Sequence, residues 1–238
     1  LSNKFGWKIG PENVGITNGS QSAFFYLFNL FSGTFSNSNK KKTIVLPLVP
    51  EYIGYADQGL EADTFVGIPA TFTMSNNHTF KYNVDFEKLE NYLEKHDNVG
   101  ALCVSRPTNP TGNVLTNEEI SRLSILAKKY DIPLMVDNAY GLPWPDIIFD
   151  DNAIPYWDEN VILSMSLSKI GLPSLRTGII IAEKRVITAL SNLNAIVALA
   201  SGSLGQAIAG DLIKDGSLVD DAKKYVKPST GIAKTDLA

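Results

Sequence analysis

The stretch Ser164-Met-Ser-Leu-Ser-Lys-Ile-Gly-Leu-Pro-Ser-Leu-Arg-Thr-Gly178 is the part of the chain around which the other segments can be interpreted. It continues an apolar run, residues 161–163, that is typical of a buried strand. Lys169 is the one charged residue between Glu159 and Arg176, so we expect it to lie out of water. Desolvation disfavours the charged form of an amine and makes it a better nucleophile. The residues alone leave a second interpretation open, in which Lys169 is a buried lysine paired with a distant carboxylate.

The pattern Ser-x-Ser-Lys-x-Gly-Leu-Pro-x-x-Arg-x-Gly resembles the lysine motif of the fold type I pyridoxal 5'-phosphate (PLP) enzymes, the aminotransferase family. In that family the lysine binds the cofactor covalently, and the serine and arginine of the motif hold the cofactor phosphate. The resemblance implies these roles for Lys169, Ser166 and Arg176. An arginine suits the last role because it can bind a phosphate through a forked pair of hydrogen bonds. Many members have one more residue between the lysine and the arginine, whereas some share the spacing seen here.

Composition limits the class of protein. The chain has 238 residues, of which 44% are hydrophobic, enough for one large α/β domain or two small ones. A net charge of −4 without a basic block argues against nucleic-acid binding. The single cysteine, Cys103, forms no disulfide framework and suits a reducing compartment such as the cytoplasm. Since no run of 18 apolar residues occurs, we expect no membrane span, and no residue pattern suggests a metal site.

A small-residue loop near the beginning of the chain is a candidate anion site. Residues 14–17 are short, apolar and β-prone, and Asn18-Gly-Ser-Gln21 leads from them into an aromatic-rich helical stretch, residues 22–31. Such a loop presents backbone N–H groups at a helix start, although on these residues alone an ordinary helix N-cap is the favoured explanation. In the family, Thr-x-Gly-x-Gln at this place forms the phosphate cup. The residues implied are Gly19, Ser20 and Gln21.

Two loops that follow apolar runs carry the next candidates. The predicted strand 43–48 is followed by Tyr52, whose ring can lie on a flat cofactor or simply pack on the core. The predicted strand 99–104 leads to the turn Asn109-Pro-Thr-Gly112, before a helix that opens with the capping box Thr116-Asn-Glu-Glu119. The resemblance implies that Tyr52 stacks on the pyridine ring and that Asn109 hydrogen-bonds the phenolic oxygen of the cofactor.

A third strand end carries a carboxylate. Residues 132–136 form a near-continuous apolar run, typical of a parallel sheet covered on both faces, and end in Asp137-Asn-Ala-Tyr140. An aspartate in this position often only caps a loop. In the family it pairs with the protonated pyridine nitrogen and keeps the ring an electron sink. The resemblance also implies that Tyr140 bonds the phenolic oxygen beside Asn109.

The alternation of apolar runs and helical segments predicts an α/β fold with a mostly parallel, doubly wound sheet. The candidate residues follow strand ends, where such sheets bind ligands. The resemblance implies that residues 1–238 are the PLP-binding large domain. Further elements are expected as a β-prone run at 64–73, a strand at 176–182, and helices at 85–94, 116–130, 183–199 and 204–213.

Within the family, residues 50–58 and 137–145 are most similar to the valine–pyruvate aminotransferases. The similarity implies amino-group transfer between a small neutral amino acid, such as valine or alanine, and a 2-oxo acid such as pyruvate, in a homodimer. Lys169 would then act as acid and base between the substrate α-carbon and the cofactor. A PLP-dependent lyase or synthase shares the same cofactor residues. A transcription regulator that keeps an aminotransferase-like domain for sensing PLP shares the Thr-Asn-Gly-Ser-Gln string.

Family members are longer, so we expect this chain to lack an N-terminal segment and a C-terminal small domain. The small domain supplies the arginine that binds the substrate carboxylate. No arginine follows Arg185 in this chain. Arg106, just before the Asn-Pro-Thr-Gly turn, is the one substitute that the sequence offers.

Overall fold

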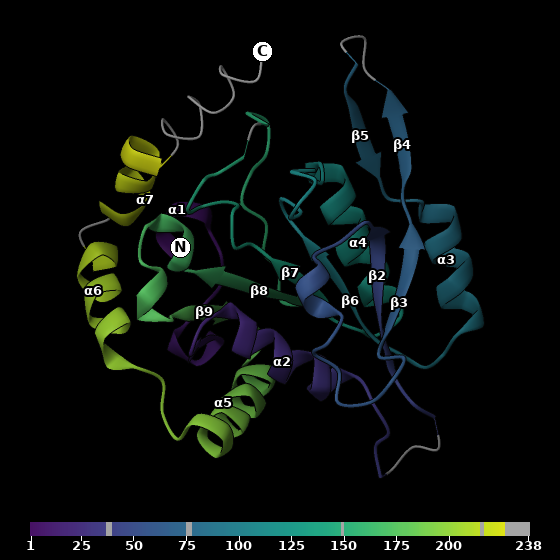
Figure 1. Cartoon of the computed structure of the whole chain (residues 1–238), viewed down its shortest axis with the longest axis horizontal. Helices are drawn as coiled ribbons and strands as arrows, with labels where there is room; N and C mark the ends of the chain where they lie inside the picture. Colours follow the sequence, from purple (N-terminus) through teal and green to yellow (C-terminus); the bar gives the residue numbers. More distant parts are fainter. Residues whose placement is uncertain (37–39, 75–77, 149, 215–216, 227–238) are drawn as a thin grey trace. The chain divides into compact units, whose positions relative to one another are not determined.

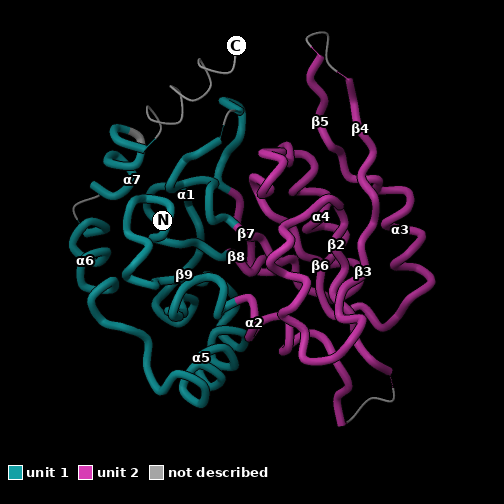
Figure 2. The backbone as a smooth tube through the Cα atoms, viewed as in Figure 1, with its two compact units in different colours: residues 1–23, 138–155, 164–238 teal, residues 24–137, 156–163 magenta. Residues whose placement is uncertain are grey.

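The computed structural model describes residues 1–36, 40–74, 78–148, 150–214 and 217–226. Two compact units are distinguished in Figure 2. The end of the predicted domain, residues 227–238, lies outside the described residues. Unit 1 comprises residues 1–23, 138–155 and 164–238, and unit 2 comprises residues 24–137 and 156–163.

Unit 2 is built on parallel strands in the order β7-β6-β2-β3. Every residue of β6 is buried, as expected for a strand covered on both faces. The first half of β8 continues this unit beside β7, where the Leu134 amide donates to the Asn160 carbonyl at 3.1 Å. The strands are β2 (Thr43–Val49), β3 (Phe65–Pro69), β6 (Val99–Ser105), β7 (Leu134–Asp137) and β8 (Val161–Ser166).

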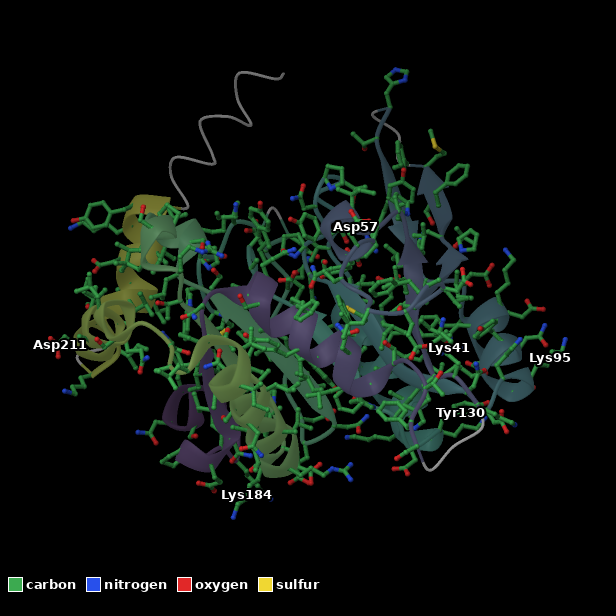
Figure 3. The ribbon with its side chains drawn as sticks, turned by 60° about the horizontal axis from the view of Figure 1, so that its bottom comes forward. Lys41, Asp57, Lys95, Tyr130, Lys184 and Asp211 are labelled. Carbon is green, nitrogen blue, oxygen red and sulfur yellow. The ribbon has the colours of Figure 1, made fainter. Side chains whose placement is uncertain are left out.

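The helices of unit 2 form where the sequence predicts them. α3 (Phe86–Lys95) is capped by Asp85. Lys95 in its last turn points outward (Figure 3), and its positive charge interacts favourably with the negative end of the helix dipole. α4 (Asn117–Lys129) has the predicted capping box. Ile125 on this helix is 64% exposed, because it lies about 200° around the helix from the buried Leu123.

The predicted β-prone run at 64–73 is wrong as a single strand. It divides after Pro69 into β3 and β4 (Thr71–Met74), and β4 pairs in antiparallel register with β5 (Phe80–Asn83), which the sequence analysis did not anticipate. Proline has no N–H to continue a ladder, and the next amide, Ala70, donates instead to the Val49 carbonyl at 3.0 Å. Within unit 2 the β4–β5 hairpin extends beyond the end of β3 (Figure 1).

Unit 1 contains the strand order β1-β9-β8, with the second half of β8 taking part. β1 and β9 pair in antiparallel register. α5 packs on β1, where Ile187 and Leu190 lie against Gly15. The remaining elements of this unit are β1 (Val14–Thr17), β9 (Gly178–Ile181), α1 (Ser2–Phe5), α5 (Lys184–Ala198), α6 (Ser203–Lys214), α7 (Ser217–Asp221) and a π-helical turn (Ala222–Val226).

One helix is shared by the two units along the chain, since α2 (Ser20–Phe31) begins in unit 1 and continues in unit 2. The predicted α/β class with a mostly parallel sheet is confirmed. Among the described residues, every helix is too short or too polar to cross a membrane.

Candidate active site

The start of α2 and the side chain of Arg176 form one cluster in unit 1. Gly19 has a φ of +95°, a conformation that favours glycine, and a Cβ there would overlap Nη2 of Arg176. The guanidinium group therefore lies directly against the residue that precedes the helix. A helix N-terminus and a guanidinium group both favour an anion, so together they form a site suited to a phosphate.

Close packing of the backbone holds this cluster in place. A Cβ on Gly178, the first residue of β9, would lie 2.6 Å from the carbonyl carbon of Gly19 and 2.7 Å from the Ser20 nitrogen. The Ser20 hydroxyl donates to the Met165 carbonyl at 3.2 Å, which ties the helix start to β8. Gln21 follows in the first turn of α2 with an exposed side chain.

The end of β8 supplies the other candidates of unit 1. The buried Ser166 hydroxyl accepts a hydrogen bond from the Ser168 amide at 3.1 Å. Ser168 opens a single 3₁₀ turn, η3 (Ser168–Ile170), which contains Lys169. The Lys169 Nζ lies 4.9 Å from the ring centroid of Tyr140, within the range of a cation–π contact. The structure thus brings together a lysine and a tyrosine that the motifs place 29 residues apart.

The expectation that Lys169 is desolvated is wrong for the described chain, because its side chain is exposed. The apolar neighbours in its sequence belong to β8 and to the turns that follow, and they do not enclose the lysine. η3 lies past the end of the strand and presents Lys169 outward. Local hydrophobicity did not determine the exposure of this side chain.

The candidate carboxylate of unit 2, Asp137, is the last residue of β7 and has a specific donor. The Tyr55 hydroxyl donates to Asp137 Oδ2 at 2.9 Å and lies 3.1 Å from the Ser105 Oγ. Tyr55 is 2% exposed, and this burial, followed by the charge of Asp137, raises the pKa of Tyr55 well above its usual value. The hydroxyl therefore keeps its proton and acts as a donor. Tyr55 was not among the residues predicted for the site, although it is the second tyrosine of the Pro-Glu-Tyr-Ile-Gly-Tyr string.

Tyr52 lies next to this pair. Its ring meets the Tyr55 ring edge-on, with 5.3 Å between centroids and 88° between planes. A Cβ on Gly54 would overlap the Tyr52 ring, so the ring lies directly over that glycine in the turn η2 (Ile53–Tyr55). An aromatic ring thereby lies next to the tyrosine that donates to the Asp137 carboxylate within unit 2.

Asn109 lies in the loop between β6 and α4, with a half-buried side chain. The loop is closed by backbone hydrogen bonds on both sides of it. The Thr108 amide donates to the Asn113 carbonyl at 2.9 Å, and the Gly112 amide donates to the Thr108 carbonyl at 2.8 Å. The predicted turn is therefore present and well ordered by its own backbone.

A second carboxyl of unit 2, Glu51, was also missed. Its Oε1 accepts from the Tyr52 amide at 2.8 Å, and its Oε2 accepts from the Ser105 amide at 2.9 Å. Desolvation raises the pKa of Glu51 to about 7, against the opposing effect of these hydrogen bonds. An acidic residue two positions after a buried strand was the signal available in the sequence.

Arg106 does not serve as the substitute for a substrate-binding arginine. It is buried, its Nε donates to the Leu115 carbonyl at 2.8 Å, and its Nη2 donates to Asn117 Oδ1 at 2.8 Å. These bonds fasten the loop that precedes α4. The arginine is thus committed to the structure of this loop.

The two units, each taken by itself, differ in donor chemistry. Unit 1 offers a guanidinium group, a helix N-terminus and hydroxyls, which suit a phosphate ester. Unit 2 offers a carboxylate beside an aromatic ring, which suits a protonated heteroaromatic ring. In the part of the chain that the structure describes, no group of acidic, histidine or cysteine side chains is arranged to hold a metal ion.

Comparison with known proteins decides the family. Residues 3–232 match the sequence model of the aminotransferases of class I and II. The chain belongs to this family. Its members depend on pyridoxal phosphate, and the phosphate-binding and ring-binding chemistry described above fits that cofactor.

Within this family, the chain is similar to several individual aminotransferases. The chain is 51% identical over 228 residues to the valine–pyruvate aminotransferase of Escherichia coli K12, covering 96% of this chain and 53% of the relative. Two examples among the similar solved structures follow. A putative amino-acid aminotransferase from Psychrobacter arcticum has a TM-score of 0.90 at 50% identity, covering 95% of this chain and 53% of that one. The valine–pyruvate aminotransferase from Salmonella typhimurium has a TM-score of 0.85 at 49% identity, covering 96% and 55%.

The chain is also similar, more weakly, to a transcription regulator. The HTH-type transcriptional regulator NorG of Staphylococcus aureus is 29% identical over 219 residues, covering 90% of this chain and 45% of the regulator. This likeness is much weaker than that to the valine–pyruvate enzymes and does not favour a regulator. The chain spans about half the length of the relatives it matches.

Proposed function

We propose that residues 1–238 are the PLP-binding large domain of an aminotransferase. The enzyme moves an amino group between a small neutral amino acid, such as valine or alanine, and a 2-oxo acid such as pyruvate. The identity of 51% to a valine–pyruvate aminotransferase, which extends over 96% of the chain, is the observation that carries the proposal. We also propose a homodimer that works in the cytoplasm, without nucleic-acid or membrane partners.

The phosphate of the cofactor is assigned to unit 1. Its proposed ligands are Gly19, Ser20, Gln21, Ser166 and Arg176. The support is the position of the Arg176 guanidinium group against Gly19 at the start of α2. A doubly charged phosphate gains both from the fork of the guanidinium group and from the partial positive charge of the helix start.

Lys169 is assigned two tasks. Its amine would bind the cofactor covalently, and once released by the incoming amino acid it would act as base and acid, moving the proton from the substrate α-carbon to C4′ of the cofactor. The neighbouring Tyr140 ring, 4.9 Å from Nζ, supports this assignment because it restricts where the amine can lie. Bound PLP supplies the electron sink that makes the α-proton acidic.

The ring of the cofactor is assigned to a second set of residues. Asp137 holds the proton at the pyridine nitrogen, Tyr52 stacks on the ring, and Asn109 and Tyr140 hydrogen-bond its phenolic oxygen. Tyr55 orients the Asp137 carboxylate through the 2.9 Å hydrogen bond to Oδ2. Its role is positional, since it acts through Asp137.

The test uses the full-length protein. Lys169→Ala should abolish the absorption band of lysine-bound PLP, cofactor fixation by borohydride, and formation of alanine from pyruvate with valine as the donor. Lys184→Ala is the matched control, because this lysine is exposed at the start of α5 (Figure 3) and has no assigned role. A borohydride-fixed adduct that persists in Lys169→Ala would refute the assignment. Product release without a 2-oxo acid acceptor would instead identify a lyase.

A further inference from the structure

Glu51 is a half-buried carboxyl in unit 2 that the proposed mechanism does not use. We propose that Glu51 is a positioning residue that fastens the Tyr52 loop to the end of β6 and places a second negative charge near Asp137, where it strengthens binding of the protonated cofactor ring. The inference rests on the proposed function, because it concerns the same cofactor.

The two oxygens of Glu51 bridge two separate segments. Oε1 accepts from the amide of Tyr52, in the loop after β2, and Oε2 accepts from the amide of Ser105, at the end of β6, at 2.8 and 2.9 Å. Hydrogen bonds to an ionised acceptor are stronger than neutral ones. A glutamine in the same position would turn its NH₂ group toward one of these N–H donors, so a carboxylate is the matched group.

Glu51 is also connected to Asp137 through Ser105 and Tyr55. The amide of Ser105 donates to Glu51, while its Oγ lies 3.1 Å from the Tyr55 hydroxyl, which donates to Asp137. Ser105 and Asp137 are moreover paired directly across β6 and β7. The two carboxyls are thus linked through Ser105, which contacts Glu51 with its amide and Tyr55 with its hydroxyl.

The charges around Glu51 determine its response to a cation. The titratable groups that interact with Glu51 are Asp137, Tyr55 and Cys103. Burial raises the pKa of Tyr55 and of Cys103 well above the usual values, so both stay neutral. Desolvation, with a smaller contribution from Asp137, raises the pKa of Glu51 to about 7. The positive charge of a protonated cofactor ring beside Asp137 would favour the ionised form of Glu51. The cofactor should therefore bind more tightly as pH rises through 7, and its binding should release a proton.

The experiment measures the dissociation constant of PLP for the full-length apoenzyme by absorbance between pH 5.5 and 8.5. The variants are Glu51→Gln and, as a matched control in the same unit, Glu87→Gln, whose side chain is exposed on α3. In Glu51→Gln we expect binding weaker by on the order of tenfold at pH 8 and loss of the component that titrates near pH 7. The control should retain both the affinity and the pH dependence of the wild type.

Glu51→Asp supplies a second variant if the glutamine protein folds poorly. Aspartate keeps the charge but is too short for both hydrogen bonds, so its pH dependence should persist with a reduced affinity. The inference is overturned if Glu51→Gln binds PLP with the wild-type affinity and pH profile, even if its thermal midpoint falls. Failure of the proposed function is a separate outcome, because the wild type itself would then form no lysine-bound PLP.

Discussion

Replacing Tyr55 by phenylalanine should lower the free energy of unfolding by about 1.5–3 kcal/mol, the range for a buried hydrogen bond to a charged group. The removed hydroxyl donates to Asp137 at 2.9 Å and lies 3.1 Å from Ser105, in a side chain that is 2% exposed. The aromatic packing on Phe24 and Phe28, with centroids 5.3 and 5.1 Å away, stays intact, so the loss reports the hydroxyl.

Tyr130 provides the matched control for the same substitution. Its hydroxyl is buried and has no hydrogen-bond partner among the described residues. Tyr130→Phe removes a desolvated polar atom and loses no bond, so it should leave stability unchanged or raise it slightly. The two variants thus have the same chemical change and opposite expected effects.

The assay is urea denaturation of the full-length apoenzyme followed by tryptophan fluorescence, with the slope compared between variants to check for a common unfolding transition. A loss below about 0.5 kcal/mol in Tyr55→Phe, or an equal loss in both variants, would refute the reasoning. Tyr55→Phe should also weaken PLP binding because Asp137 loses its orienting donor, whereas Tyr130→Phe should not.

Three further expectations follow from the same unit. Gly54→Ala should displace the Tyr52 ring, which occupies the position of the new Cβ, and should therefore weaken PLP binding measured by absorbance. A dissociation constant equal to that of the wild type would show that the ring is free to move. Cys103 should resist thiol reagents in the native protein and react after unfolding, because burial raises its pKa well above the usual value; rapid native labelling would contradict this. The pKa of Glu51 is raised from 4.5 to about 7, so between these pH values the folded apoenzyme holds a proton on Glu51 that the unfolded chain has lost. The free energy of unfolding should therefore fall by roughly 3 kcal/mol as pH rises from 4.5 to 7, relative to Glu51→Gln. Equal pH profiles of the two proteins in chemical denaturation would exclude that linkage.

The sequence alone predicted the elements whose formation depends on local interactions. The capping box of α4 is one case, because Thr116 and Glu119 satisfy each other's backbone groups three residues apart. The apolar runs that became β2, β6, β7 and β8 are another, since a strand buried on both faces needs little beyond continuous hydrophobicity. The ordered motifs at the ends of these strands also predicted the family that the comparisons confirm.

The tertiary structure decided which side chains meet. Tyr55 reaches Asp137 across 82 residues of sequence, and Glu51 reaches Ser105 across 54, so no local pattern could reveal either pair. The environment of single charges was equally hidden. Lys169 has apolar neighbours in sequence and is exposed, whereas Arg106 lies beside polar turn residues and is buried. Burial and hydrogen bonding depend on segments brought together by folding, while helix caps and strand hydrophobicity depend on residues a few positions apart.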